Sequence, residues 1–456
     1  MADTYYIRKV KIEGLFGRGD EISLDFQEGV NCIYGANGSG KTTIINLLVA
    51  GLSCDIDKFL ASRCDNLTVY VAKTGQKRPI LFFNVKKTRN EKNQLDGLSY
   101  DFADNFYDKN LNSDAPSGQT RKMIRETLKF NYLPLYRYNE SELDEHVKIE
   151  DRYTRNVNKN WRLDPPDENS ADPLRRMLGV LERKFKDEYS GKQREIRENL
   201  ELLKNKVLEK LLIDDVLVSK AKESKIKKNE IKSDDYKKAQ QKLDEIGLRL
   251  PGDKLEKHFA AMMKASQDVS AKIEEVRLLQ ENPQRDQDKL YELFTEHSTL
   301  LKIYRTLDTV HNRFLSILSD VEKSTEYRVN ALKDFKKFED LLKDFFINKE
   351  FEFSESGQFK FQCRGHTVGI DDLSSGEKHI MALLGKVALS SSDRDVFIAD
   401  EPELSLHLAW QRKLLPALRK LAPGMQIIVA THAPAIIPST AAKIDLDEIN
   451  HDSASV

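Results

Sequence analysis

The chain has 456 residues, of which 39% are hydrophobic and 32% charged, and its formal net charge is -1. This length exceeds one ordinary hydrophobic core, so we expect two structural units, with much of the charge on long solvated helices. The near-neutral charge excludes a globally basic nucleic-acid binder, and no apolar run is long enough to span a membrane. The four cysteines lack paired spacing and the N-terminus is not a signal peptide, so we expect a reducing, cytoplasmic location.

Period-two alternation of apolar residues predicts antiparallel strands within residues 5–35, and further strands at 67–72 and 80–85. Residues 90–119 are rich in Asn, Asp, Ser and Gly, and we expect a surface loop or a partly disordered segment there. Residues 130–138 are expected to form another strand. This part of the chain therefore predicts a mostly β region around the first motif.

The first motif is GANGSGKT at residues 35–42, between an apolar strand and a helical run. It fits the phosphate-loop pattern, in which glycines let backbone N–H groups converge on phosphate oxygens at a helix N-terminus. Lys41 is expected to reach the β- and γ-phosphates, and Thr42 to ligate Mg²⁺. The nucleotide-binding residues predicted here are Gly35, Asn37, Gly38, Ser39, Gly40, Lys41, Thr42 and Thr43.

From about residue 172 to residue 348 the pattern changes to helical periodicity rich in Lys and Glu. Apolar residues recur there at spacings of four and three, which predicts helices packed against one another. One such stripe comprises Leu300, Tyr304, Leu307, His311, Phe314, Leu318 and Val321, and a second comprises Ile196, Leu200, Leu203 and Val207. Because Pro251-Gly252 and Asn282-Pro283 interrupt the pattern, we expect several antiparallel helices of moderate length, a short coiled coil with His311 in its core.

Four phenylalanines at positions 351, 353, 359 and 361 flank a Ser-Glu-Ser-Gly turn and predict a β-hairpin. We expect these rings to be core residues rather than a base-stacking platform. The next motif is LSSGE at residues 373–377, followed by a helical run. Ser374 or Ser375 together with Glu377 can cap that helix, and a ligand can also approach its positive end.

Apolar residues 396–399 predict a buried strand that delivers Asp400 and Glu401 to its carboxyl end. Beside a phosphate loop, Asp400 is suited to hold Mg²⁺, and Glu401 to polarise the water that attacks the γ-phosphate. Residues 425–430 predict a second buried strand, after which the imidazole of His432 can contact the γ-phosphate. Taken singly, an acidic pair is more often a solvated strand end, and one histidine is more often structural.

The order of these motifs resembles the ABC-type ATPase superfamily, and more narrowly its SMC, Rad50, RecF and OLD-like branch. The resemblance covers roughly residues 1–140 and 345–440, and it implies an α/β P-loop NTPase head that binds ATP and Mg²⁺. It also implies that LSSGE is a signature motif, which caps the γ-phosphate bound to a second subunit. The signature residues are then Ser374, Ser375, Gly376 and Glu377. The family's glutamine loop is not obvious, since no Gln occupies residues 137–139.

The resemblance implies an order of domains. Residues 1–165 and 349–445 would form the two halves of the ATPase head, residues 166–348 a helical insertion, and residues 446–456 a polar tail. Catalysis by Glu401 and His432 would take place in a sandwich of two copies, within dimers or larger rings. We therefore expect slow, regulatory ATP turnover.

Two absences narrow the resemblance. The insertion has no cysteine, which excludes a Cys-x-x-Cys zinc hook, and the short segment after His432 leaves no room for the Toprim nuclease of OLD proteins. The chain thus resembles the PtuA family, the ATPases of Septu anti-phage systems, which implies a separate HNH nuclease partner of PtuB type and DNA contact through the complex. Two alternatives stay open: a RecF-like repair ATPase that binds DNA directly, and a scaffold that binds ATP with little turnover.

Overall fold

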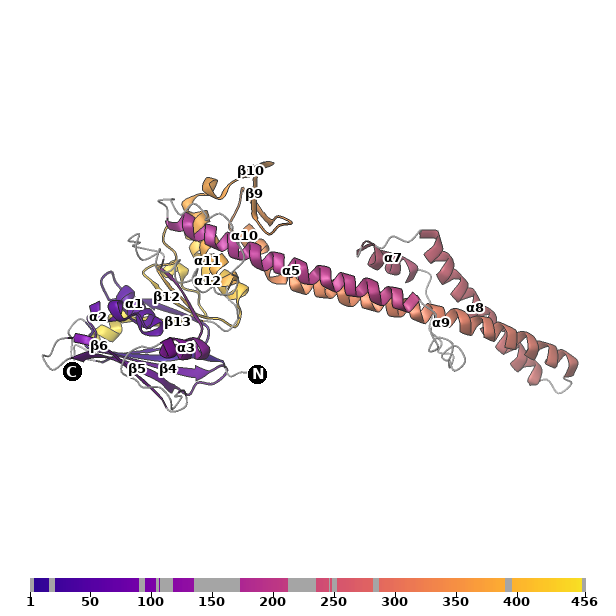
Figure 1. Ribbon diagram of the computed structural model, residues 1–456, viewed down its shortest axis with the longest axis horizontal. Helices are drawn as coiled ribbons and strands as arrows, with labels where there is room; N and C mark the ends of the chain where they lie inside the picture. Colours follow the sequence, from indigo (N-terminus) through magenta and orange to yellow (C-terminus); the bar gives the residue numbers. More distant parts are fainter. Residues whose placement is uncertain are drawn as a thin grey trace. The chain divides into compact units, whose positions relative to one another are not determined.

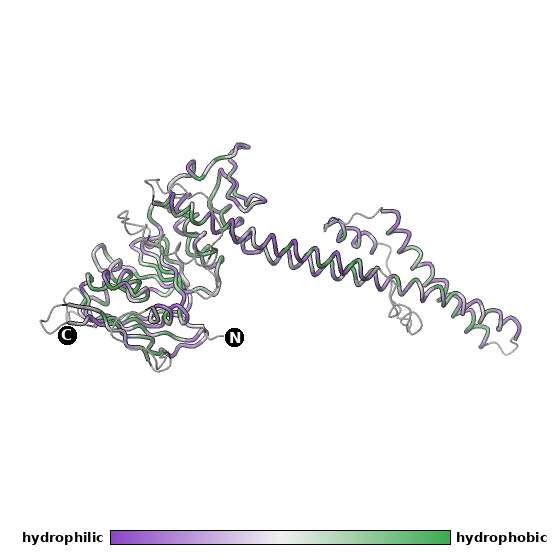
Figure 2. The backbone as a smooth tube through the Cα atoms, in the orientation of Figure 1, coloured by the Kyte–Doolittle hydropathy of each residue, from purple (hydrophilic) through white to green (hydrophobic). Residues whose placement is uncertain are grey.

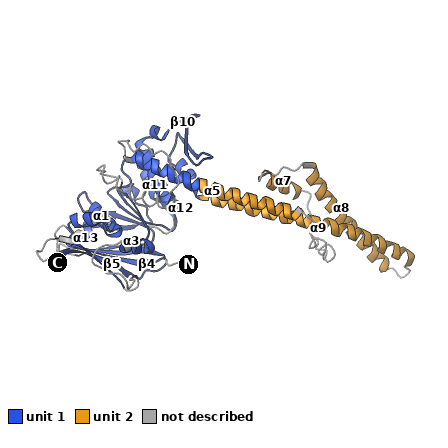
Figure 3. Cartoon of the chain, in the orientation of Figure 1, with its two compact units in different colours: residues 1–189, 334–456 blue, residues 190–333 orange. Residues whose placement is uncertain are grey.

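The computed structural model describes residues 4–15, 21–89, 95–103, 106, 118–134, 173–211, 235–245, 247, 252–281, 287–389 and 396–452. Its contacts divide the chain into unit 1, residues 1–189 and 334–456, and unit 2, residues 190–333 (Figure 3). One division falls inside helix α5 (Pro173–Leu211), which continues from one unit into the other. This division does not test the domain boundaries predicted at residues 165 and 348, which remain predictions.

In unit 1, a parallel sheet carries the sequence motifs, and its described strands have the order β13-β3-β12-β11-β7. Their bounds are β3 (Val30–Tyr34), β7 (Phe130–Pro134), β11 (Val396–Asp400), β12 (Gln426–Thr431) and β13 (Ala442–Asp445). Every residue of β11 and β12 is buried, as short apolar runs inside a covered parallel sheet predict. Because β12 pairs with both β11 and β3, the carboxyl ends of all three strands meet at one edge.

A second, antiparallel sheet of unit 1 has the order β2-β1-β4-β5-β6. Its strands are β1 (Tyr5–Glu13), β2 (Glu21–Asp25), β4 (Asn66–Lys73), β5 (Ile80–Arg89) and β6 (Leu95–Phe102). The predicted strands at 67–72 and 80–85 are confirmed. The prediction of a loop at residues 90–119 is wrong where strand β6 forms. Leu98 and Tyr100 of this strand lie in the core and are 2% and 4% exposed. Helix α3 (Gly118–Thr127) follows.

Helix α1 (Lys41–Ser53) packs against both sheets. Its Ile44 and Leu48 share one buried cluster with Val69 of the antiparallel sheet and Ile428 of the parallel sheet. Figure 1 shows α1 close to β12 and β13, and Figure 2 shows how hydrophobic the strands of this unit are. The short helix α2 (Ile56–Ala61) comes next in the chain. This packing fixes the start of α1 at the sheet edge that carries the motifs.

The predicted hairpin is confirmed as β8 (Glu350–Phe353) paired antiparallel with β9 (Phe359–Cys363), which also pairs with β10 (His366–Val368). Phe351 and Phe361 are 3% and 1% exposed, so they are core residues as expected. Their rings lie in an aromatic cluster with Phe338 of helix α10 (Lys333–Lys343).

The carboxyl-terminal part of unit 1 supplies the remaining helices. They are η2 (Ile370–Asp372), α11 (Ser375–Ala388), α12 (Leu408–Leu421), η3 (Pro434–Ile436) and α13 (Leu446–Asp452). The prediction of a polar tail from residue 446 does not describe α13, because Leu446 is 1% exposed and belongs to the same core cluster as α1. Residues 453–456 of that tail lie outside the described residues.

The described residues of unit 2 lie mainly in helices, with α7 (Asp235–Glu245), α8 (Gly252–Gln280) and α9 (Gln287–Ala331) joining the end of α5. The predicted stripe on α9 is confirmed: part of it packs against α8 and part against α5 and α7. The prediction of moderate length is wrong for two of these helices, since α5 has 39 residues and α9 has 45. Helix α8 begins at Gly252 and α9 at Gln287, and α9 extends about 68 Å at roughly 1.5 Å per residue.

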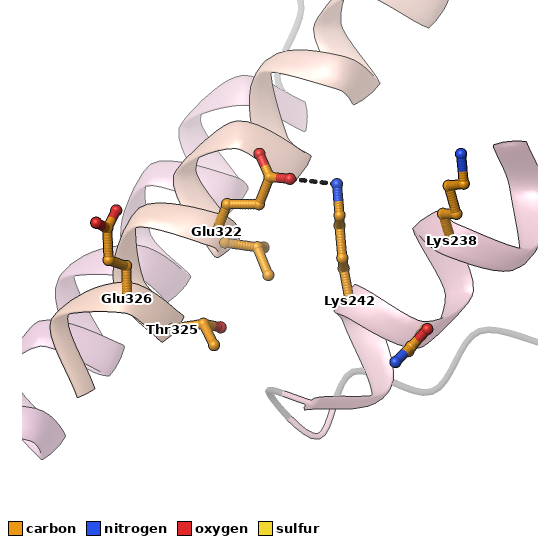
Figure 4. A pocket seen from close by; sticks show the side chains of 7 residues that line it. Lys238, Lys242, Glu322, Thr325 and Glu326 are labelled. Carbon is orange, nitrogen blue, oxygen red and sulfur yellow. Dashed lines mark hydrogen bonds and ion pairs between the residues drawn. The ribbon is translucent and has the colours of Figure 1, made fainter. Parts of the chain in front are cut away.

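His311 is 3% exposed, which confirms it as a packed core histidine. Its ring stacks on His258, with 3.2 Å between Nδ1 of His311 and Nε2 of His258. A separate pocket of about 600 Å³ lies between α7 and α9, where Lys242 pairs with Glu322 (Figure 4). Within the described ranges, none of the helices combines the length and apolar character needed to cross a bilayer.

Candidate nucleotide-binding site

Glycines shape the loop between β3 and α1. Gly38 and Gly40 have φ angles of 84° and 101°, which residues with a side chain rarely adopt. Gly40 is the N-cap of α1, so no side chain caps the first-turn N–H groups, and that turn holds no acidic residue. An uncapped helix terminus of this kind can donate its N–H groups to a bound phosphate.

Lys41 begins α1 and folds back over this loop. The residue is 5% exposed, and its Nζ donates to the carbonyl oxygens of Gly35 and Ala36, both at 2.9 Å. Charged phosphate oxygens are stronger acceptors for an ammonium group than these neutral carbonyls. Thr42, next in the chain, is exposed, as are Asn37 and Gly38, whereas Ser39 and Thr43 are half-buried.

Asp447 of α13 anchors the start of the same loop, because its Oδ2 accepts a hydrogen bond from the Ala36 N–H at 2.8 Å. The sequence analysis missed Asp447. No local pattern links residues so far apart in the chain, and the segment was assigned to a polar tail. The contact needs β13 to pair beside β3, which only the folded sheet shows.

The acidic motif lies at the same sheet edge as the loop. Asp400 ends β11 opposite Ala430 of β12, and Thr431 ends β12 opposite Tyr34 of β3. Paired strands lie about 4.8 Å apart, so these strand ends are close neighbours. Asp400 is 9% exposed, and its strand contacts α1, the helix that carries Thr42.

Glu401 and His432 approach each other beyond the strand ends. The N–H of Glu401 still donates to the Ala430 carbonyl of β12 at 2.8 Å, but Glu401 adopts a left-handed φ of 46°, so the strand conformation of β11 ends there. Nδ1 of His432 lies 3.3 Å from Oε1 of Glu401, and the two side chains are 41% and 25% exposed. The two residues predicted to be catalytic are therefore adjacent and reach solvent.

Glu403 is a third carboxylate at this place, and the sequence analysis did not name it. The residue is 1% exposed, accepts a hydrogen bond from Thr431 Oγ1, and has its Oε1 3.9 Å from Nδ1 of His432. Burial raises its pKa, although the Thr431 bond and the nearby His432 act in the opposite direction. The sequence contains a signal that could have identified Glu403: in the Asp-Glu-Pro-Glu run at residues 400–403, a second glutamate follows the expected acidic pair.

The LSSGE segment begins α11, and Ser374 is its N-cap. The Ser374 N–H donates to Oε2 of Glu377 at 2.7 Å, and the Glu377 N–H donates to Ser374 Oγ at 3.3 Å, a complete capping box. Burial favours a raised pKa for Glu377, but hydrogen bonds from Lys349 and Ser374 outweigh it, and the pKa is lowered. The capping interpretation is confirmed; Ser374 and Ser375 are also exposed at the helix end, so a ligand can reach them.

Gly376 joins α11 to the turn that follows Asp400. A Cβ atom on Gly376 would lie 3.2 Å from both the Ser405 carbonyl oxygen and Cζ3 of Trp410, so the glycine permits close packing. His379, on the next turn of α11, is 4% exposed. The signature segment thus packs on the turn that holds Glu401 and Glu403.

Acidification is expected to destabilise unit 1 through His379. Burial lowers the pKa of His379 from 6.5 to about 4. Below pH 6.5 the unfolded chain then binds a proton that the folded chain does not, so this stability contribution is complete above pH 6.5 and is lost as pH falls towards 4. Urea denaturation at about pH 7 and pH 5 measures the loss, which is at most about 1.4 kcal/mol per pH unit. An equal loss in His379→Gln would contradict this assignment.

The residues at this edge fit ATP and Mg²⁺. The Lys41 ammonium and the uncapped end of α1 suit phosphate, while the Thr42 hydroxyl and the Asp400 carboxylate are oxygen ligands of the kind that Mg²⁺ prefers. Ser374 and Glu377 belong to a different segment, in which the Glu377 carboxylate accepts hydrogen bonds from Lys349 Nζ. The position expected for a glutamine loop, residues 137–139, lies outside the described residues.

Comparisons with known proteins show to which family this chain belongs. A model described as "AAA ATPase domain" matches residues 6–437. The chain is 33% identical over 81 residues to the retron Ec83 probable ATPase of Escherichia coli, covering 15% of each protein. It is 31% identical over 84 residues to the retron Vc95 probable ATPase of Vibrio cholerae, covering 16% of each. The matched segments thus span only a small part of these relatives.

The comparison with solved structures also finds two Smc head domains. One, from Pyrococcus furiosus, has an extended coiled coil and is bound to the C-terminal domain of ScpA; it is 13% identical, with a TM-score of 0.41 over 95% of this chain and 91% of that one. The other, from Pyrococcus yayanosii, is 13% identical, with a TM-score of 0.40 over 99% of both chains. The family match spans the phosphate loop, Asp400 and His432, and this chain therefore belongs to the AAA ATPase domain family.

Proposed function

We propose that this chain binds ATP with Mg²⁺ at the edge of its parallel sheet, hydrolyses it, and uses its nucleotide state to control a separate nuclease. The observation that carries the proposal is the position of Lys41 over a glycine loop, next to the strand end that presents Asp400. A structural turn would need neither a buried lysine in the loop nor a helix left without a side-chain cap.

Each side chain of the site has a proposed task. Lys41 and the first-turn N–H groups of α1 hold the β- and γ-phosphates, and Thr42 and Asp400 hold Mg²⁺, which neutralises phosphate charge. Glu401 accepts a proton from the attacking water, and its exposed side chain can reach solvent to do so. His432 contacts the γ-phosphate from beside Glu401.

The second half of the site is proposed to come from another copy of the chain. Ser374 and Ser375 are exposed at the N-terminal end of α11, where the helix dipole favours an anion. In a sandwich of two chains, this end would cap the γ-phosphate bound to the partner. ATP would then promote dimers or larger rings, and separate chains would turn over slowly.

Substitutions of Ser374 by Asp and by Ala test its role as the N-cap of α11 separately from its proposed contact with the γ-phosphate. Asp is a good N-cap, so Ser374→Asp should retain stability, while its negative charge repels the γ-phosphate and abolishes ATP-dependent dimerisation. Ser374→Ala should lower the free energy of unfolding by about 1 kcal/mol. Light scattering with and without ATP measures the molar mass and hence dimerisation, and urea denaturation measures the free energy of unfolding. Normal ATP-dependent dimers of Ser374→Asp would contradict the sandwich.

The nuclease partner is proposed from the PtuA resemblance, and two of the relatives above are named as retron ATPases. An HNH nuclease of PtuB type is the expected partner, in the cytoplasm, with DNA reached through the complex. Such control needs only differential affinity: a nucleotide that binds two assembly states 100-fold differently shifts their balance by about 2.7 kcal/mol.

Copurification with the product of the adjacent gene tests this proposal. We expect a stable complex whose DNA cleavage differs with and without ATP. The matched control is the same complex carrying Lys41→Ala, in which nucleotide should no longer change cleavage. A lone ATPase whose turnover is stimulated by DNA would overturn nuclease control and favour direct action on DNA.

A further inference from the structure

Glu403 is buried beside the two residues proposed to carry out hydrolysis. Its side chain is 2% exposed, whereas those of Glu401 and His432 are 25% and 41% exposed. Nδ1 of His432 lies 3.3 Å from Oε1 of Glu401 and 3.9 Å from Oε1 of Glu403. The imidazole therefore faces two carboxylates through the same nitrogen, one at the surface and one in the interior.

A buried carboxylate is a costly way to stabilise a fold. Glu403 receives a hydrogen bond from Thr431, but within the described part of the chain its Oε2 has no hydrogen-bond partner. Well-packed apolar residues often replace buried charged groups with neutral or stabilising effect. Stability alone therefore does not explain a carboxylate at this position, and its contacts point to His432.

Thr431 connects Glu403 to the backbone next to His432. Its Oγ1 donates to Glu403 Oε1 and accepts a hydrogen bond from the Ala433 N–H at 3.0 Å. These two bonds hold the residues on both sides of His432, at the point where the chain leaves β12. Glu403 thus restrains the histidine in two ways, through the backbone turn and through the charge that faces Nδ1.

We propose that Glu403 is a positioning residue for His432, which holds Nδ1 towards the carboxylates and leaves Nε2, across the ring, to meet the γ-phosphate. This inference rests on the proposed role of His432 in ATP hydrolysis. The hydrogen bond made by one imidazole nitrogen decides which nitrogen carries the proton and how the ring is oriented. Buried carboxylates orient catalytic imidazoles in the same manner in other enzymes.

Glu403→Gln in the full-length chain tests the proposal. Glutamine has nearly the same shape and still accepts from Thr431, but it removes the charge that faces His432. We expect kcat for ATP to fall about 10- to 100-fold, while KM and the Kd for a non-hydrolysable ATP analogue change less than about twofold. Thr431→Val should cause a similar loss, and Thr431→Ser, which retains the hydroxyl, should behave like the wild type.

A double-mutant cycle with His432→Ala separates positioning from a purely structural role. If Glu403 acts through the imidazole, Glu403→Gln should add less than about twofold to the loss caused by His432→Ala alone. An unchanged kcat, or a full additional loss in the His432→Ala background, would overturn the inference. Should Glu403→Gln fail to fold, Thr431→Val provides the same comparison.

Failure of the inference is distinguishable from failure of the proposed function. Turnover of Glu401→Gln at the wild-type rate would overturn the proposed role of Glu401 as the base in hydrolysis. Inactive Glu401→Gln combined with a fully active Glu403→Gln would overturn only the positioning role.

Discussion

Glu401→Gln is expected to slow ATP turnover by about 10²- to 10⁴-fold while leaving ATP affinity nearly unchanged. Glutamine retains the size of the side chain but cannot accept a proton from the attacking water. The residue is outside the phosphate loop, so Lys41 and the end of α1 should still hold the nucleotide. Single-turnover hydrolysis and ATP binding, measured on the same preparation, give the two quantities.

Slower hydrolysis in Glu401→Gln should also prolong the ATP-bound assembly, which the molar mass in ATP reports. Glu355→Gln is a matched control, because this exposed glutamate lies in the turn between β8 and β9. Wild-type turnover in Glu401→Gln would show that another group is the base. Reduced turnover in the Glu355 variant would show that the effect is not specific to the site.

Lys41→Ala is expected to weaken ATP binding by about 100-fold or more, because the phosphates lose the cation nearest to them. The ammonium group already lies at the loop, held by the carbonyls of Gly35 and Ala36 at 2.9 Å. Titration with a fluorescent ATP analogue measures the affinity, and circular dichroism checks that the variant is folded.

The control for this variant is Lys122→Ala on α3, where the lysine side chain is 74% exposed and makes a surface ion pair with Glu126. Exposed ion pairs of this kind contribute little to stability, so the variant should fold normally and bind ATP with the affinity of the wild type. Tight ATP binding by a folded Lys41→Ala chain would show that the nucleotide is held elsewhere.

Much of the candidate site could be proposed from the sequence because its motifs are local. A phosphate loop needs glycines, a lysine and a hydroxyl residue within a few positions, between a strand and a helix, so residues 35–42 carry nearly all of that information. Asp400 likewise follows directly from a short apolar run that must be a buried strand. The helical stripes of α5 and α9 were predictable for the same reason, since heptad-like spacing is also local.

Other features depended on contacts between distant segments. The Asn- and Asp-rich segment at residues 90–119 predicted a loop, yet β6 forms there because Tyr100 pairs opposite Val85 and packs in the core. Helices α5 and α9 are longer than the Pro-containing interruptions suggested, with 39 and 45 residues. In both cases tertiary packing outweighed local composition.

The sequence by itself determined the motifs, their order, and the proposed task of Lys41, Asp400 and Glu401, because each follows from neighbours within one strand-loop-helix segment. Only the tertiary structure showed that Asp447 anchors the phosphate loop and that Glu403 lies beneath His432 and Glu401. These contacts join residues brought together by parallel pairing of β13, β3, β12 and β11. A parallel sheet takes its neighbouring strands from distant parts of the chain, so no local pattern can specify which side chains meet at its edge.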